Sequence, residues 1–236
     1  MPATLTTNFS NSPHADGLSS SNVATESAQA PQQSPRQLPE PAPVPVLVLD
    51  ACVMMSGLLR PLLLNLALAG AFRPVWSDRI GQEWVRNAAR LWPIAPSLLE
   101  HEWQLMQLQF PQANMGDVTA YEAGLRHSDR KDWHVVAAGI AAVDRQAPGP
   151  VSVMTWNLKD FSRSELRKQQ LGLTDPDRLL SLWWPTQTRQ LRQSIENTVA
   201  ELITSGRRQP EPTTTLLRRD RLFRLAAMVE RSTHPA

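Results

Sequence analysis

The sequence has very little cysteine and no long apolar run, and both absences narrow the classes of protein to which it can belong. Cys52 is the only cysteine among 236 residues, so no intramolecular disulfide can form, which fits a reducing cytosol. No apolar run approaches the ~20 residues that a membrane-spanning helix needs, and the N-terminus lacks the basic start and apolar core of a signal peptide. We therefore expect a cytoplasmic protein without a membrane segment.

Strong charge of one sign is also missing. A formal net charge of +2 is ordinary for a solvated surface and does not by itself indicate nucleic-acid binding. The shares of hydrophobic residues (42%) and charged residues (19%) are usual for a chain that folds around a core. Composition therefore predicts a globular protein and leaves its function open.

The chain divides into three stretches by the pattern of its residues. Residues 1–45 are rich in Ser, Pro, Gln, Asn and Ala without apolar periodicity, which predicts a disordered tail. Residues 46–174 alternate apolar runs with amphipathic stretches and are expected to form an α/β domain. Residues 175–236 are predicted to form a helical C-terminal extension.

The strands and helices of the α/β region can be placed from apolar spacing. The runs 46–50 and 151–155 predict strands that are buried on both faces, as in a parallel sheet, and a shorter strand is expected over 72–76. Helices are expected over 58–69, 77–91 with Ser77 as N-cap, 96–110, 117–127, 132–143, 177–184, 187–205 and 214–231. The strand–helix–strand order predicts a three-layer α/β/α fold with a mainly parallel sheet.

Acidic and amide side chains fall at the ends of these elements or on a helix flank. They are Asp50 after the first strand, Glu83 on the helix that follows Ser77, Asp132 at a helix start, and Asn157 and Asp160 after the strand at 151–155. Any one of them is more often a cap or turn residue than a ligand. Ligands in open α/β sheets collect beyond the carboxyl ends of the strands, so their joint placement indicates a site. Oxygen ligands without cysteine favour Mg²⁺ or Mn²⁺ over zinc.

The amino-acid sequence around these acids resembles that of PIN domains. The blocks that carry the resemblance are 49–53, 58–60, 72–77, 80–84, 129–138 and 153–161. Their order and spacing are similar to those of the VapC-type toxins of bacterial toxin–antitoxin pairs. Many members have Asn two residues after the first acid, whereas this chain has Cys52. The sequence Asp-Ala-Cys-Val at 50–53 resembles that of a PIN subfamily with a helical C-terminal extension.

The resemblance implies a function and a set of site residues. It implies an Mg²⁺- or Mn²⁺-dependent endoribonuclease, the toxin of a type II toxin–antitoxin pair, with RNA as substrate, a cognate antitoxin as partner and a homodimer as a common assembly. Asp50, Glu83 and Asp132 match the first three acidic positions of the family, and either Asn157 or Asp160 fills the fourth. The four acids would be catalytic, and all five residues would bind the metal. The alternative is a non-catalytic PIN-fold module that binds RNA or a protein partner. A phosphatase-like or response-regulator domain fits less well, because its phosphoacceptor and lysine context are missing.

Other polar residues have two readings that the sequence leaves open. Thr155 and Ser56 either hold a water or phosphate or are ordinary strand and turn residues. His134 is read as structural. Arg60, Arg79, Arg86 and Lys159 either contact the RNA backbone or form a solvated face. The arginines at 189, 192, 218, 219 and 221 form either an RNA-guiding lid or a solvated partner-binding surface.

Overall fold

The strand β1 (Val46–Leu49) has all of its residues buried, as expected of a strand covered on both faces. The structure is a computed structural model, and it describes residues 43–233. On one side β1 pairs with β2 (Arg73–Val75) and on the other with β3 (Val151–Met154), and β4 (Leu171–Thr174) pairs with β3. All of these pairs are parallel and the order is β2-β1-β3-β4. The predicted α/β class with a parallel sheet is therefore confirmed.

The chain changes direction within the sheet at β1. It runs from β1 to β2 on one side and later crosses back to β3 on the other side. Such a reversal is the place where open parallel sheets bind ligands, beyond the carboxyl ends of the two diverging strands. The amide of Asp50 donates to the carbonyl of Met154 at 3.2 Å, so the segments that follow β1 and β3 begin side by side.

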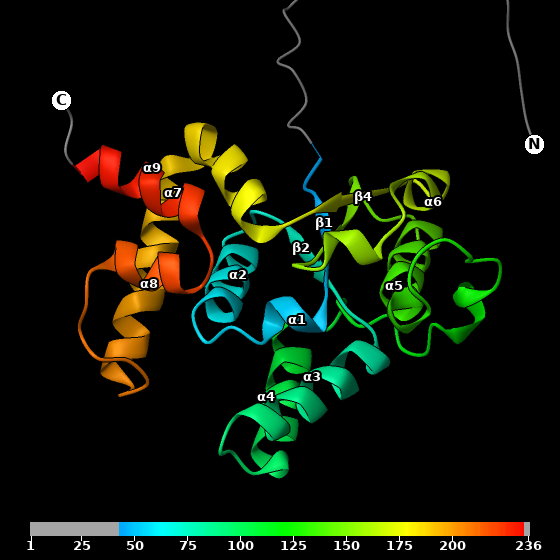
Figure 1. The fold of residues 1–236 in the computed structure, drawn as a ribbon, viewed down its shortest axis with the longest axis horizontal. Coiled ribbons are helices and arrows are strands. Elements are labelled where there is room, and N and C mark those ends of the chain that lie inside the picture. Colours follow the sequence, from blue (N-terminus) through cyan, green and yellow to red (C-terminus); the bar gives the residue numbers. More distant parts are fainter. Residues whose placement is uncertain (1–42, 234–236) are drawn as a thin grey trace, which may run out of the picture. The chain divides into compact units, whose positions relative to one another are not determined.

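Helices surround the sheet and join its strands (Figure 1). Those before β3 are α1 (Ala51–Met54), α2 (Leu59–Leu68), α3 (Asp78–Leu91), α4 (Pro96–Gln109) and α5 (Trp133–Asp144). The helix α5 contacts β1, β2 and β3. A Cβ placed on Gly139 of α5 would lie 2.9 Å from the side chain of Leu171, so this glycine permits the close approach of helix and sheet.

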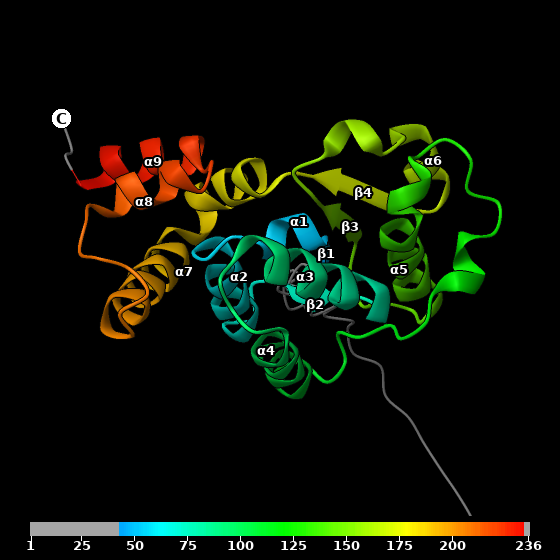
Figure 2. The same ribbon diagram turned by 60° about the horizontal axis from the view of Figure 1, so that its bottom comes forward.

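The chain after β3 is mostly helical (Figure 2). It contains α6 (Arg163–Lys168), α7 (Pro176–Thr204), α8 (Thr213–Arg219) and α9 (Phe223–Thr233). Short 3₁₀ helices, η1 (Thr119–Glu122), η2 (Arg130–Asp132) and η3 (Leu158–Asp160), lie in the loops. The helix α9 packs on α7 and α8, and α7 packs on α2, so the C-terminal helices contact the α/β region directly.

Several expectations about the secondary structure are wrong. The helix expected over 117–127 is only the 3₁₀ turn η1. The break expected between the helices over 177–184 and 187–205 is confirmed, by contrast: α7 consists of two helical segments that meet at a kink, where Pro185 cannot donate and Gln187 leaves helical geometry. The helix expected over 214–231 is instead two, because Arg221 adopts a left-handed φ of 64° between them. Neither α1, α6 nor β4 was expected.

Two further expectations concern the organisation of the chain. The predicted tail, 1–45, lies almost wholly outside the described residues. All described residues belong to one compact unit, Pro41–Ala236, and the boundary between 174 and 175 stays a prediction. Within residues 43–233, no helix combines the length and apolar character that crossing a bilayer requires.

Candidate metal centre

The carboxylate of Asp50, at the carboxyl end of β1, accepts hydrogen bonds from two segments of the chain. It is 4% exposed. The hydroxyl of Thr155, which follows β3, donates to Oδ2 of Asp50 at 2.6 Å. The thiol of Cys52 donates to the same oxygen at 3.1 Å, and the Cys52 amide donates a long, weak bond of 3.4 Å to Oδ1. Because both side-chain donors bind Oδ2, Oδ1 is the oxygen that is left for a ligand.

Cys52 and Thr155 thus belong to the site. The sulfur of Cys52 also accepts from the amide of Trp156 at 3.4 Å, and Thr155 is fully buried. Burial, together with the negative charge of Asp50, raises the pKa of the Cys52 thiol to about 12. The thiol therefore keeps its proton at neutral pH and acts as a hydrogen-bond donor to Asp50.

Asp132 lies at the junction of η2 and α5, where it is the N-cap residue but makes no capping hydrogen bond. It is 7% exposed, and within the described residues its Oδ2 is buried without a hydrogen-bond partner. Burial raises the pKa of Asp132 to about 6, with a further contribution from the charge of Asp50. A buried carboxylate oxygen that lacks a partner is costly, and a bound cation would offset that cost.

Asp129, Asp132 and Asp160 form an acidic cluster with one oxygen of each within 4.8 Å of the others. This cluster could hold a metal ion. The structure thus brings Asp160 next to Asp132, as the sequence predicts. Asp129 was not predicted as a site residue, although its spacing contains the signal: residues three apart lie on the same side of a 3₁₀ turn.

Lys131 lies beside the same cluster. Its ammonium group is 3.0 Å from Oδ2 of Asp160 and 3.4 Å from Oδ2 of Asp129. The lysine side chain is 61% exposed, so it is free to move away when another cation approaches. Asp132 has no such pairing in the described part of the chain, and it is the acid whose charge remains least compensated.

Glu83 approaches the site from α3. Its Oε2 lies 3.0 Å from Nε2 of His134, which is 1% exposed and stands two residues after Asp132 on α5. This contact lowers the pKa of Glu83, against the effect of burial, which raises it. Within residues 43–233, the group of acids that could share a metal ion does not include Glu83, which reaches only His134 on the helix that Asp132 begins. His134 is therefore more than the core residue that the sequence suggested.

Asn157 and Asp160 share the turn after β3. The amide of Asn157 donates to the hydroxyl of Thr155 at 3.0 Å, and the Asn157 side chain is exposed. The carbonyl of Asp160 accepts from the amide of Asp129 at 2.7 Å. Asp160 is thus fixed within the acidic cluster, while Asn157 stands at its edge.

Glu165 of α6 holds the loop that carries Asp129 and Asp132. Its buried carboxylate accepts from the backbone amides of Arg126, His127 and Ser128 at 2.6, 3.1 and 2.8 Å. Burial alone would raise the pKa of Glu165, but these hydrogen bonds lower it to about 2. These hydrogen bonds were not predicted, because Glu165 is far in the sequence from the amides that it binds.

Some residues that the sequence offers as RNA or phosphate contacts have other partners. Arg60 is buried, pairs with Glu102 at 2.7 Å and lies over the ring of Trp84. Arg79 pairs with Glu122 at 3.0 Å. Ser56 donates to Oδ1 of Asp220 at 2.5 Å. Arg86 and Lys159 are exposed. A contact of Arg60 with RNA is therefore excluded in this conformation, because its guanidinium group lies inside the protein.

No protein-family model, no curated protein sequence and no solved structure matches the chain.

Proposed function

We propose that the chain is an Mg²⁺- or Mn²⁺-dependent endoribonuclease with PIN-type acids on a three-layer α/β/α domain, and that it is the toxin of a type II toxin–antitoxin pair. One observation carries the proposal. The buried Oδ2 of Asp132 lacks a partner next to Asp129 and Asp160, at the edge where β1 and β3 end. A buried acid of this kind is typical of a ligand rather than of a structural ion pair.

The donor set fits a hard divalent cation. The ligand atoms of the cluster are carboxylate oxygens, to which Asn157 would add an amide oxygen, and the thiol of Cys52 stays protonated. Mg²⁺ and Mn²⁺ prefer such oxygens. When bound, a divalent ion would lower the pKa of a water and offset charge on a phosphate.

The side chains of the chain itself would bind the ion and position the water. Asp132 and Asp160 would bind the ion, and Asp50 would add Oδ1, since its Oδ2 is occupied by Thr155 and Cys52. Glu83, positioned by His134, would accept a proton or orient a water at the edge of the cluster. Phosphodiester hydrolysis of RNA needs this positioning of charge and water, and RNA is the substrate that the resemblance to PIN domains implies.

A toxin of this kind has protein partners. We propose that a cognate antitoxin protein inhibits the nuclease and that the nuclease itself forms a homodimer. Both rest on the resemblance to VapC-type toxins in the blocks 49–53, 80–84 and 129–138.

The second candidate is a PIN-fold module that binds RNA or a protein without cleavage. The ammonium group of Lys131 favours it, because that group already offsets the charges of Asp129 and Asp160 without a metal. The uncompensated Oδ2 of Asp132 favours the nuclease instead.

A cleavage assay with a matched control separates these candidates. A mixed RNA pool would be incubated with wild type, Asp132→Asn and Asp144→Asn, with Mg²⁺, with Mn²⁺ and with a chelator. Asp144 lies at the other end of α5 and accepts from Tyr121, so its loss leaves the acidic cluster intact. The nuclease proposal requires metal-dependent cuts by wild type and Asp144→Asn, and their loss in folded Asp132→Asn. Equal cutting by Asp132→Asn, or cutting in chelator, would refute the proposed site.

A further inference from the structure

Arg221 stacks on Trp156 beside the candidate metal centre. Its guanidinium carbon lies 4.7 Å from the centre of the Trp156 ring. Arg221 belongs to the turn between α8 and α9, whereas Trp156 follows Thr155 after β3. This is a cation–π contact, and within residues 43–233 the N–H groups of Arg221 donate to no other side chain, so they remain available to another partner.

Trp156 is joined to the acids by its backbone. Its amide donates to the sulfur of Cys52, and both Cys52 and the neighbouring Thr155 donate to Asp50. The Trp156 ring is half-buried against the core. The backbone of Trp156 is therefore linked to Asp50 through Cys52.

The backbone of Arg221 is in a conformation that few side chains adopt. Its φ is 64°, in the left-handed region that favours glycine or asparagine and strains other residues. Gln146 and Gln170 adopt the same conformation, and at Arg221 it ends α8, with the amide of Leu222 donating to the carbonyl of Leu217 at 2.9 Å. This helix end fixes the place of Arg221 in the turn.

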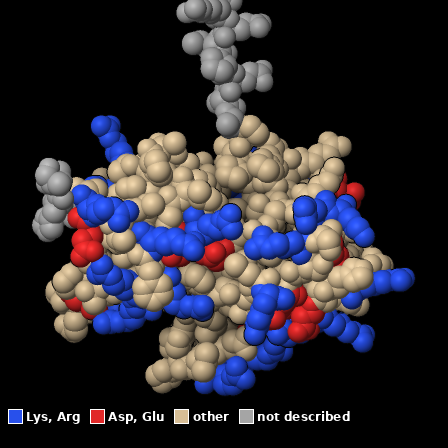
Figure 3. Space-filling model, turned by 45° about the horizontal axis from the view of Figure 1, so that its top comes forward, with Lys and Arg blue, Asp and Glu red and all other residues tan. Residues whose placement is uncertain are grey.

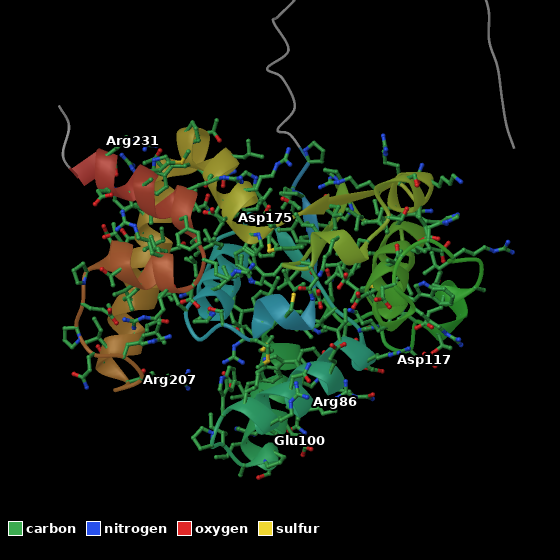
Figure 4. The ribbon with its side chains drawn as sticks, in the orientation of Figure 1. Arg86, Glu100, Asp117, Asp175, Arg207 and Arg231 are labelled. Carbon is green, nitrogen blue, oxygen red and sulfur yellow. The ribbon has the colours of Figure 1, made fainter. Side chains whose placement is uncertain are left out.

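The turn that carries Arg221 is anchored on both sides. Before it, Asp220 accepts from Ser56, which follows α1. After it, the carboxylate of Asp177 accepts from the amides of Arg224 and Leu225 at 3.0 Å each. Asp177 lies in the first turn of α7, two residues after the N-cap Asp175. Figure 4 labels Asp175, where the chain leaves β4. The segments after β1 and β4 thus fix the position of Arg221.

Arg221 also differs from its neighbours in charge pairing. Arg219 binds Glu211 with two hydrogen bonds and Arg218 binds Glu230. Arg221 is exposed, and no carboxylate pairs with it within the described residues. On the face drawn in Figure 3, basic side chains are spread widely with acidic ones between them. The charge of Arg221 is available to a ligand that comes from outside.

We propose that Arg221, held on Trp156, binds the phosphate backbone of single-stranded RNA on the Asp50 side of the candidate metal centre. The N–H groups of the guanidinium contact a phosphate, and its outer face accepts a stacked base, which only an unpaired strand can offer. This inference rests on the proposed function and names the strand contact of that same site. It also gives the C-terminal helices a role, since the turn between α8 and α9 carries Arg221 to Trp156.

Binding of a fluorescently labelled single-stranded RNA oligonucleotide, measured by anisotropy in chelator, tests the proposal without cleavage. We expect Arg221→Gln to weaken binding about three- to tenfold. The slope of log affinity against log salt concentration should shrink by about 0.7, the change for one lost phosphate contact on a single strand. Arg221→Lys should restore the slope but only part of the affinity, and Trp156→Ala should weaken binding by about tenfold.

The matched control is Arg192, which lies 5.9 Å over the ring of Trp184 within α7 and contacts none of the acids. Arg192→Gln should leave both affinity and salt slope at the wild-type values. Arg221→Gly separates a structural role from a binding role. Glycine relieves the left-handed strain, so this variant should melt at the same temperature as wild type or higher, yet bind RNA as weakly as Arg221→Gln.

Each outcome decides something. Unchanged affinity and salt slope in Arg221→Gln would overturn the proposal and favour a protein partner on this surface, and so would absence of RNA binding by wild type. Wild-type affinity in Arg221→Gly would overturn it as well. Metal-dependent cleavage with no effect of Arg221 would remove only this inference. Arg221-dependent binding without cleavage in any metal would remove only the nuclease.

Discussion

The hydroxyl of Thr155 lies 2.6 Å from Oδ2 of Asp50 and so connects the residue after β3 to the residue after β1. Thr155 is fully buried. The hydrogen bond fixes the orientation of the Asp50 carboxylate across the two strands between which the sheet changes direction. The position of Asp50 therefore depends on a residue 105 positions away in the chain.

Thr155→Val tests this positioning role. Loss of the hydroxyl should weaken Mn²⁺ binding about tenfold, as is usual when a group that orients a metal ligand is lost. It should also destabilise the fold by about 1–3 kcal/mol, because Asp50 loses a buried donor. Calorimetric titration with Mn²⁺ measures the first effect. Thr198→Val is the control: Thr198 is also fully buried, and its hydroxyl donates to the carbonyl of Ser194 in α7. Equal Mn²⁺ affinity in Thr155→Val and Thr198→Val would contradict the assignment.

Asp132→Asn should stabilise the metal-free protein at neutral pH. Burial and the charge of Asp50 raise the pKa of Asp132 to about 6 from its ordinary 3.8, so the folded state holds this proton more tightly than the unfolded state. Stability of wild type therefore falls as pH rises from about 4 to 6, by up to about 3 kcal/mol. The variant lacks this fall, and its advantage should appear in that window and persist above it.

Thermal unfolding in chelator across pH 4 to 8 measures the difference, and Asp144→Asn is its control. Added Mn²⁺ should raise the melting temperature of wild type but not of Asp132→Asn. A wild type that is more stable than Asp132→Asn at pH 7 in chelator would show that the charge of Asp132 is compensated within the protein.

Glu165→Gln should destabilise the protein mainly above pH 5. The amides of Arg126, His127 and Ser128 overcome the effect of burial and lower the pKa of Glu165 to about 2 from 4.5. A lowered pKa contributes stability that is complete above the unfolded value and is lost as pH falls from about 4.5 toward 2. We expect a loss of about 2 kcal/mol at pH 7, where the carboxylate accepts these bonds.

Urea unfolding at pH 7 and pH 3 measures this loss. The gap between wild type and Glu165→Gln should narrow at pH 3. Glu196→Gln, an exposed change on α7, should unfold like wild type at both values. A gap of the same size at pH 3 would mean that side-chain shape, not charge, holds the loop.

Lys131→Met should tighten Mn²⁺ binding. The ammonium group of Lys131 lies near Asp129 and Asp160 and competes with an incoming cation. Because the lysine is exposed and its ion pairs are weak, we expect a gain of only about two- to fivefold. Lys159→Met, at an exposed residue adjacent to Asp160, removes a nearby charge without an ion pair and should have a smaller effect. Weaker binding in Lys131→Met would show that Lys131 assists the site.

The elements with strong local signals could be predicted from the sequence. The continuous apolar run of β1 and the Ser77 cap of α3 are both present as expected, and the hydroxyl of Ser77 accepts from the amide of Ile80. These features depend on residues that are close in the chain. The same holds for Asp50 and Asp160, whose places after β1 and β3 follow from where each strand ends.

Features that depend on distant contacts could not be predicted. The strand β4 contains Gly172, which weakens its pattern; a Cβ there would lie 2.3 Å from the hydroxyl oxygen of Ser152. The break between α8 and α9 carries neither Gly nor Pro, and the bond of Asp220 with Ser56 accompanies it. The roles of Cys52 and His134 likewise depend on partners that only folding brings near.

Anomalous diffraction from crystals soaked in Mn²⁺ tests the central claim most directly. The account predicts an anomalous peak in direct contact with Oδ2 of Asp132 and at least one further carboxylate from Asp50 or Asp160, and no peak in crystals of Asp132→Asn. Wild-type crystals with a peak elsewhere, or with none at this edge of the sheet, would contradict the account.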